Sequence, residues 1–211
     1  MNSKRRNNCS EVIEEYLKNT HAETHRTYQL ELKGVFKLQS DPEDKRFRTD
    51  INNKMLLWHG SRLTNYVGIL SQGLRIAPPE APVTGYMFGK GVYFADMVSK
   101  SANYCFTNPN NPEGLLLLCE VALGETNDKF NADFNASNLP AGKHSTKGVG
   151  KSYPPRTSYI DLDGVQVPIG KPVHDTSSGQ HYSLLYNEYI VYEVSQVRLK
   201  YLLRVNFRYR T

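Results

Sequence analysis

Cysteine is scarce in this sequence, and its few cysteines have no motif spacing. Cys9, Cys105 and Cys119 are an odd set without a Cys-x-x-Cys pair, which excludes a disulfide framework and a cysteine-based zinc site. Such usage is typical of a reducing intracellular compartment. Long apolar runs are also missing: the longest, residues 115–119, is far shorter than the ~20 residues of a membrane-spanning helix. Residues 1–8 contain no apolar stretch of a signal peptide.

Several well-known motifs are incomplete. The chain has no Gly-x-Gly-x-x-Gly fingerprint, so a dinucleotide-binding dehydrogenase has no support. Residues 150–152 read Gly-Lys-Ser, but the glycine that a phosphate-binding loop needs five positions earlier is Ser145. His21 and His25 have the spacing of zinc-protease ligands, yet Ala22 stands where that motif requires an acid. We therefore expect no metal site.

The bulk composition fits one folded domain. The chain has 211 residues, of which 39% are hydrophobic and 22% charged, enough apolar material for one core. The net charge of +5 is concentrated in residues 1–8 and 198–211. Basic ends can attract an anionic partner such as nucleic acid, or simply maintain solubility. Both interpretations remain open at this point.

The apolar pattern predicts many strands and a few short helices. Helical spacing predicts helices at 10–19 and at 64–70, the latter ending at Gly73, and Asp96 is a candidate N-cap for a third helix through Cys105. Loops are expected at 41–45 and in the Pro- and Gly-rich segment 77–91. Strands are predicted at 28–38, 55–58, 92–95, 115–123, 159–162, 165–169, 186–194 and 203–209. This order favours a largely antiparallel α+β domain over a doubly wound parallel sheet.

Three short stretches each hold one residue that a nucleotide-cleaving site could use. They are His59 in Leu-Trp-His-Gly-Ser, Tyr93 in Gly-Lys-Gly-Val-Tyr-Phe-Ala and Glu188 in Tyr-Asn-Glu-Tyr. Each stretch lies at a predicted strand end or in the adjoining loop, where a rigid scaffold presents functional groups. Any one of them alone is a weak signal, because a lone histidine is more often structural and a strand glutamate more often a solvated charge.

Five ordered blocks carry a family resemblance. Residues 56–62, 73–95, 99–105, 142–150 and 186–192 closely resemble the catalytic domain of the DNA-damage-responsive poly(ADP-ribose) polymerases, and the resemblance runs from about residue 10 to about residue 207. It implies an ADP-ribosyltransferase fold, with two packed, mainly antiparallel sheets around an NAD cleft and short flanking helices. On this reading residues 1–9 form a basic flexible tail and residues 10–211 the catalytic domain.

The resemblance makes His59, Tyr93 and Glu188 the His-Tyr-Glu triad of an enzyme that consumes NAD as substrate and needs no metal. Nicotinamide is cationic in NAD and leaves as a neutral molecule, so no general acid is required. This differs from ordinary glycoside cleavage, which uses two carboxylates. Glu188 is expected to hold the ribose 2′-hydroxyl, stabilise the oxocarbenium-like transition state and orient or deprotonate the attacking hydroxyl. Lys100 is expected to position substrate beside it.

The remaining site residues are likewise implied by the resemblance. His59 would bind the adenine-side ribose, Gly60 and Ser61 the nicotinamide carboxamide, and Tyr93 and Tyr104 the two faces of the nicotinamide ring. The implied NAD-binding set is His59, Gly60, Ser61, Arg75, Tyr86, Gly91, Tyr93, Ala95, Ser101 and Tyr104. Met87, Leu185 and Tyr186 would line the acceptor side, where a growing ADP-ribose chain sits.

Three functions remain open from the sequence: a transferase that elongates ADP-ribose chains on proteins, a transferase limited to single additions, and a domain that binds without turnover. The triad argues against the last, and Glu188 with the acceptor wall favours elongation. In DNA-dependent relatives a helical regulatory subdomain precedes this domain, whereas about nine residues precede the first predicted helix here. We therefore expect activity without DNA-dependent autoinhibition, no DNA-binding module, no membrane partner, and a nuclear or nucleo-cytoplasmic location.

Overall fold

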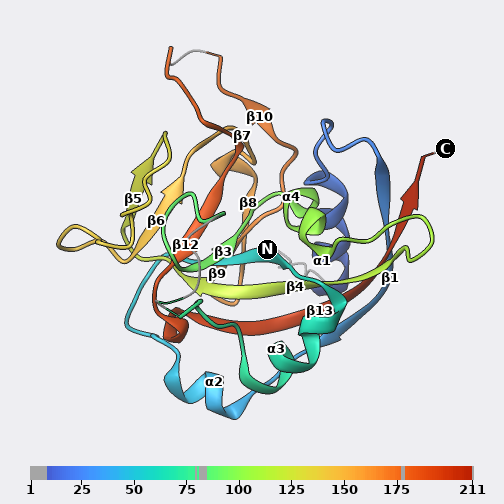
Figure 1. Cartoon of the computed structure of the whole chain (residues 1–211), viewed down its shortest axis with the longest axis horizontal. Coiled ribbons are helices and arrows are strands. Elements are labelled where there is room, and N and C mark those ends of the chain that lie inside the picture. Colours follow the sequence, from blue (N-terminus) through green and yellow to red (C-terminus); the bar gives the residue numbers. More distant parts are fainter. Residues whose placement is uncertain (1–8, 79, 81–84, 177–178, 211) are drawn as a thin grey trace, which may run out of the picture.

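The computed structural model describes residues 9–78, 80, 85–176 and 179–210 (Figure 1). Its helices are α1 Cys9–Asn19, α2 Asp41–Arg46, α3 Tyr66–Gln72 and α4 Val98–Ala102, with 3-10 turns η1 Leu63–Asn65, η2 Asn103–Cys105, η3 Arg156–Ser158 and η4 Val194–Gln196. Its strands are β1 Tyr28–Lys37, β2 Lys54–Gly60, β3 Val92–Phe94, β4 Glu113–Ala122, β5 Thr126–Lys129, β6 Ser145–Gly148, β7 Gly150–Tyr153, β8 Tyr159–Leu162, β9 Val165–Pro168, β10 Val173–His174, β11 Leu184–Tyr186, β12 Glu188–Val191 and β13 Val197–Tyr209.

The largest sheet has the strand order β1-β13-β4-β2-β9-β8. Strand β4 lies at its centre because its apolar run is continuous: Leu116, Leu117 and Leu118 point to alternate faces and are all fully buried. It pairs antiparallel with β13 on one side and β2 on the other. The predicted buried strand at 115–123 is therefore confirmed.

Two smaller sheets complete the described part of the fold, with orders β3-β12-β6-β5 and β10-β7-β11. Most pairings are antiparallel, but β9 with β2, β11 with β7 and β6 with β5 are parallel. The predicted α+β class is confirmed. Its strands are distributed over three sheets in the residues described, rather than the two that we expected.

Each face of the large sheet buries its own apolar cluster. Helix α1 covers one face with Val12, Ile13, Tyr16 and Leu17, as its helical spacing predicted. Strands β3 and β12 and helix α3 cover the other face. Figure 1 shows α1 at the end of the sheet near β1, and β3 and β12 at the opposite end. This second layer brings β12 beside the end of β2.

The segment 41–45 is a helix, not the predicted loop. Pro42 lies in the first turn of α2, where proline is compatible with a helix, and acids precede bases along it. Tertiary contact completes the explanation: the buried Glu43 carboxylate accepts hydrogen bonds from the Leu199 amide nitrogen at 2.9 Å and from Arg46 Nη2 at 3.3 Å. A turn-rich composition thus concealed a short helix that is fixed by strand β13.

Two other boundaries differ from the sequence prediction. Asp96 does not cap a helix: α4 begins at Val98 after Met97, and its regular part ends at Ala102 before the turn η2. The expected strand 186–194 is divided at Asn187 into β11 and β12, and its last residue begins η4. In both cases a buried polar side chain has a tertiary partner that its sequence neighbours do not reveal.

The other predicted elements are present with small shifts of their ends. Helix 64–70 begins as the turn η1 and ends at Gly73, whose φ of 78° suits glycine. The strand expected at 203–209 is the second half of β13. In the predicted loop 77–91, residues 79 and 81–84 lie outside the described part. No helix in the described ranges is long and apolar enough to cross a membrane.

Candidate active site

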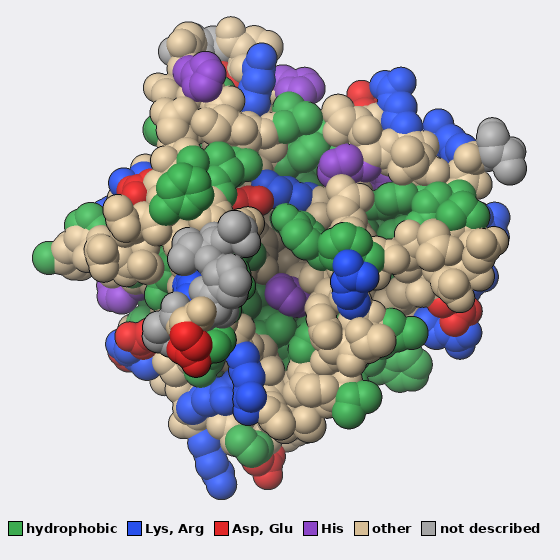
Figure 2. Space-filling view, in the orientation of Figure 1, with side chains coloured by type: hydrophobic (Ala, Val, Ile, Leu, Met, Phe, Trp, Pro, Cys, Tyr) green, Lys and Arg blue, Asp and Glu red, His purple; other side chains and the backbone are tan. Residues whose placement is uncertain are grey.

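The ends of β2, β3 and β12 meet at one place. Trp58 and Ala95 exchange two backbone hydrogen bonds, of 2.9 and 3.0 Å, which join β2 to β3, and Tyr93 pairs with Ile190 across β3 and β12. A cavity of about 850 Å³ opens here and adjoins a smaller one of about 90 Å³. Figure 2 shows this face hollowed near its centre. The volume of the larger cavity is within the usual range for small-molecule sites.

The residues of the predicted triad line both cavities. His59, Tyr93 and Glu188 border the larger and the smaller cavity, together with Tyr104. They come from positions separated by 34 to 129 residues, so the fold brings them together as the sequence predicted. The shared border shows that the two cavities are adjacent. A ligand with two linked parts could occupy both.

His59 is held in one tautomer. Its Nδ1 lies 2.9 Å from the Tyr93 carbonyl oxygen, which can only accept, so Nδ1 carries the proton. Burial lowers the pKa of His59 from its usual 6.5, so the ring is neutral near neutral pH. The Nε2 atom is then an acceptor for a ligand hydroxyl, which matches the ribose contact that the resemblance implies.

Gly60 presents its backbone to the small cavity. Successive residues of a strand direct their N–H and C=O groups to opposite sides. Because Trp58 bonds to Ala95 on the β3 side, the Gly60 groups face that same side, beyond the last pair of the two strands. A Cβ on Gly60 would come within 1.9 Å of the Ser101 carbonyl oxygen. Glycine is therefore required for the close approach of β2 and α4.

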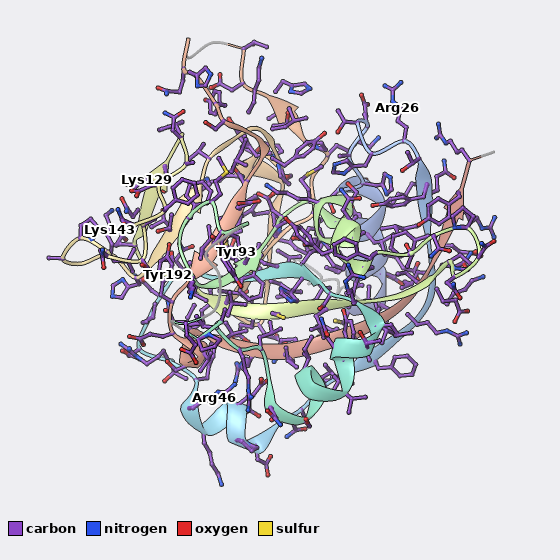
Figure 3. The ribbon with its side chains drawn as sticks, in the orientation of Figure 1. Arg26, Arg46, Tyr93, Lys129, Lys143 and Tyr192 are labelled. Atoms are coloured by element: carbon purple, nitrogen blue, oxygen red, sulfur yellow. The ribbon has the colours of Figure 1, made fainter. Side chains whose placement is uncertain are left out.

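Two tyrosines flank the small cavity. The Tyr93 hydroxyl donates to the Gly89 carbonyl at 2.7 Å and accepts from the Phe88 amide at 3.0 Å, which fixes its ring on β3. Figure 3 shows Tyr93 in the interior of the molecule, near Tyr192. Tyr104, on the turn after α4, is 55% exposed and borders the same cavity. A flat ring between two such aromatic faces is a favourable arrangement.

Glu188 is paired with a lysine at the border between the two cavities. Its Oε1 lies 3.0 Å from Lys100 Nζ, and the two side chains are 13% and 15% exposed. Lys100 Nζ also donates to the Tyr186 carbonyl at 2.7 Å. Burial lowers the pKa of Lys100, while the nearby Glu188 opposes this shift. The carboxylate is thus oriented by a cation while remaining accessible from the cleft.

The remaining predicted NAD residues line one or the other of the two cavities. Arg75, Tyr86, Gly91 and Ser61 line it, and Ser61 Oγ accepts a hydrogen bond from Asn65 at 2.9 Å. Ala95 and Ser101 line the small cavity. Thr64, Gly68 and Gln72 of η1 and α3 also line the larger cavity, although the sequence did not single them out. The sequence pattern could have indicated them, because their spacing of four residues places them on one face of the helix that follows the His-Gly-Ser stretch.

The predicted acceptor side is divided. Met87 lines the larger cavity, but neither Leu185 nor Tyr186 borders either cavity. Tyr186 is buried, and its hydroxyl shares a 2.6 Å hydrogen bond with Thr24 on the other side of the backbone. Its contribution to this site is the carbonyl that holds Lys100. The acceptor role of these residues stays a prediction.

Comparison with known proteins gives the family. Residues 10–207 match the family described as the poly(ADP-ribose) polymerase catalytic domain. The chain belongs to this family. It is 57% identical over 204 residues to poly(ADP-ribose) polymerase 1 of Danio rerio, 57% over 202 residues to poly(ADP-ribose) polymerase 2 of Arabidopsis thaliana, and 56% over 200 residues to poly(ADP-ribose) polymerase 2 of Homo sapiens.

These matches cover 96%, 94% and 94% of the chain, but only 20%, 31% and 34% of those three proteins. The chain thus spans between a fifth and about a third of the length of these poly(ADP-ribose) polymerases. The resemblance identified from the five sequence blocks is confirmed at the level of the catalytic domain.

The sequence did not predict a buried hydrogen-bond network in this polymerase domain, which is centred on Asp96 and Asn187. The buried Asp96 Oδ2 accepts hydrogen bonds from Asn187 Nδ2 at 2.7 Å and from the Tyr189 hydroxyl at 3.0 Å, while Asn187 Oδ1 accepts the Gly150 amide at 2.9 Å. Burial raises the pKa of Asp96. The available signal was an acid directly after an apolar strand and an asparagine inside another, both of which need partners when buried.

Metal ligands are not grouped in the part of the chain that the structure describes: no three His, Cys, Asp or Glu side chains there are placed to hold an ion. The three cysteines are free thiols.

Proposed function

We propose that this chain is an NAD-dependent protein ADP-ribosyltransferase that elongates ADP-ribose chains on protein acceptors. One observation carries the proposal: Glu188, oriented by Lys100 at 3.0 Å, stands where the small ring-sized cavity joins the larger one. The family match and the high identity to poly(ADP-ribose) polymerases support it. NAD is the substrate, with nicotinamide in the small cavity between Tyr93 and Tyr104.

The reaction follows from this placement. The bond between the nicotinamide nitrogen and ribose C1′ breaks, and its electron pair returns to the ring, so nicotinamide leaves neutral. Positive charge develops on the ribose, and the Glu188 carboxylate stabilises it through space and through the 2′-hydroxyl. An acceptor hydroxyl attacks C1′ and loses its proton toward Glu188. Gly60 and the tyrosines hold the leaving ring in line during this step.

Elongation is favoured over single transfer because Glu188 can serve both the bond that breaks and a sugar hydroxyl that attacks. Met87 on the wall of the cleft is available to the acceptor unit. The partners in this proposal are NAD, acceptor proteins and the growing chain, and the location is nuclear or nucleo-cytoplasmic. A domain that only binds is disfavoured, because the Glu188 carboxylate is oriented by Lys100 and borders both cavities, where it can act on the bond that breaks.

Labelled NAD incubated with the chain, followed by denaturing electrophoresis, distinguishes the alternatives. A ladder supports elongation, a single labelled band indicates single transfer, and no label indicates binding alone. Glu188→Gln should remove the ladder and lower the transfer rate roughly 10²- to 10³-fold, the cost of one electrostatic contact to the transition state. NAD affinity should change little, because the amide keeps the shape of the side chain.

Glu193→Gln is the matched control. Glu193 carries the same charge, but its side chain is 62% exposed and has only surface contacts, with Arg48 at 3.4 Å and the Ser195 hydroxyl at 3.4 Å, among the described residues. It should leave the ladder unchanged. A ladder of normal length from Glu188→Gln would refute the role given to that carboxylate. Broken DNA added to parallel samples tests the expected DNA independence, which strong stimulation would contradict.

A further inference from the structure

A second cavity, of about 800 Å³, lies on the reverse side of the strand that carries Glu188. Asn187 and Tyr189 line this cavity, whereas Glu188 between them lines the active-site cavities. Alternation along β12 accounts for the difference. Across the sheet Tyr189 pairs with Lys147 of β6 and Glu188 with Gly148, so Lys147 shares the face of Tyr189. The two cavities are thus separated by one layer of sheet.

Aromatic side chains form much of this second wall. They come from five separate elements or loops and are Phe130, Tyr153, Tyr159, Tyr182 and Tyr189. Phe130 and Tyr182 meet edge to face with ring centres 5.5 Å apart. All but Tyr189 are only half-buried, so ring surface remains open to the cavity. Such walls suit a flat heteroaromatic ring, which gains stacking energy whatever its substituents.

The cations at this cavity form no ion pair with a described carboxylate, although Lys147 acts electrostatically on the buried Asp96. Lys147 and Arg156 line it, and neither forms an ion pair with any described residue, unlike Arg48, Arg198 and Arg204 elsewhere in the chain. Lys147 Nζ lies 5.7 Å from the centre of the Tyr189 ring. The one acid in the lining, Asp128, is exposed and accepts a 2.6 Å hydrogen bond from Thr126. The lining therefore keeps a net positive charge.

We propose that this second cavity binds a nucleotide, with the base against the tyrosines and the phosphates at Lys147 and Arg156. Neither feature alone would indicate such a ligand: a cationic surface accepts any anion, and an aromatic wall accepts any flat ring. Their combination in a cavity of about 800 Å³ matches the size and the two-part chemistry of a nucleotide. Strands β5, β6 and β12, which supply part of its lining, lie on the left of Figure 1, away from α1 and β1.

We expect the bound nucleotide to be an adenine nucleotide. This identification rests on the proposed function, because ADP-ribose units are the product of that reaction. A free adenine nucleotide and an ADP-ribose unit share the same recognised groups. The site itself does not depend on catalysis. Binding measured with Glu188→Gln protein, in which no turnover consumes or makes ligand, therefore separates failure of this site from failure of the proposed enzyme.

Equilibrium dialysis of the full chain with labelled ADP-ribose tests the proposal. Two bound molecules per chain are expected, one in each cavity, and one in the double variant Lys147→Gln, Arg156→Gln. The matched control is Arg26→Gln with Lys143→Gln, which removes the same charge at positions that do not line the cavity and lie far from each other at the periphery (Figure 3). The control should keep both sites.

Further arms identify the ligand. Tyr153→Leu should weaken second-site binding about tenfold, the usual size of one base-stacking contact. Competition by AMP as strong as by ADP-ribose indicates recognition of the nucleotide part, and competition by ADP-ribose alone indicates the whole unit; both support the proposal. Equal competition by inorganic phosphate would overturn it, as would a number of bound molecules that the double variant leaves unchanged. If the double variant unfolds, the single variant Arg156→Gln, at an exposed position, decides.

Discussion

Replacing Gly60 by alanine tests the geometry on which the site depends. The new Cβ would lie 1.9 Å from the Ser101 carbonyl oxygen and 2.7 Å from its carbon. A carbon and an oxygen normally stay about 3.3–3.6 Å apart, so α4 and β2 must separate by roughly 1.5 Å. Backbone on both sides leaves no flexible group that could yield. The Leu116 side chain lies 3.4 Å from the same Cβ, so the added methyl group meets a second neighbour as well.

The magnitude follows from what this separation breaks. Ser101 Oγ donates to the Trp58 carbonyl at 3.0 Å, and that bond cannot survive the movement. Losing it costs about 0.5–1.5 kcal/mol, and overpacking of a filled interior about 1–3 kcal/mol. For a domain of this size 1 kcal/mol corresponds to about 2–4 °C in melting temperature. We expect Gly60→Ala to melt roughly 5–12 °C lower.

Activity should fall more than stability. Helix α4 and the turn after it carry Lys100, Ser101 and Tyr104, so their movement displaces both the partner of Glu188 and one wall of the small cavity. A misplacement of about 1 Å in a reacting centre costs on the order of 10²-fold in rate. Initial rates of nicotinamide release should therefore fall at least about a hundredfold at temperatures where the variant is still folded.

Gly34→Ala provides the comparison, since a Cβ there meets only the Phe36 ring at 3.5 and 3.6 Å, which is ordinary contact. It should change neither melting temperature nor rate appreciably. The measurements are calorimetric melting and nicotinamide release, made on both variants at one temperature below both transitions. A Gly60→Ala protein with the stability and rate of the Gly34→Ala protein would refute the close approach of β2 and α4.

Two further predictions concern titrating groups. Burial lowers the pKa of His59, so stability should be lost as the pH falls from the usual value of about 6.5 to that lowered pKa. Protonation of Nε2 also removes its acceptor role, so the Kd for NAD should rise as the pH falls through the lowered pKa, a dependence that His59→Gln should lack. Burial raises the pKa of Asp96, so its contribution to stability declines as pH rises above about 3.9. The Asn side chain of Asp96→Asn can still accept hydrogen bonds from Asn187 and Tyr189. The melting temperature of this variant should therefore be higher than that of the unsubstituted chain at about pH 8, and the gain should shrink on acidification. An equal loss of melting temperature at every pH would contradict this.

Much of the site could be predicted because its residues are local to motifs. His59, Gly60 and Ser61 are consecutive, and Tyr93 and Ala95 belong to one strand end, so a resemblance confined to short blocks captures them. Backbone geometry then places the rest of each block automatically. The buried strands were predictable for a similar reason: a continuous apolar run such as that of β4 has one favourable environment, the centre of a sheet.

What the sequence concealed depends on contacts between distant segments. Helix α2 has the composition of a loop and is held by Glu43 against β13, 156 residues away. Asp96 has the position of a helix cap, yet its partners lie 91 and 93 residues further along the chain. A polar residue that is predicted locally as a cap or turn can be satisfied by tertiary hydrogen bonds instead, and no pattern of neighbours distinguishes the two cases.

Asn187 explains why one strand can serve two cavities. Its side chain takes the Gly150 amide with one end and Asp96 with the other, so β11 stops there and β12 begins at the next residue. At this break the Tyr186 carbonyl accepts a hydrogen bond from Lys100, and Lys100 in turn orients Glu188. The same break anchors the reverse face, where Tyr189 donates to Asp96. The Asn187 side chain thus lines the second cavity, while the carbonyl of the residue before it holds the lysine that orients Glu188, so this one break in the chain shapes both faces of the strand.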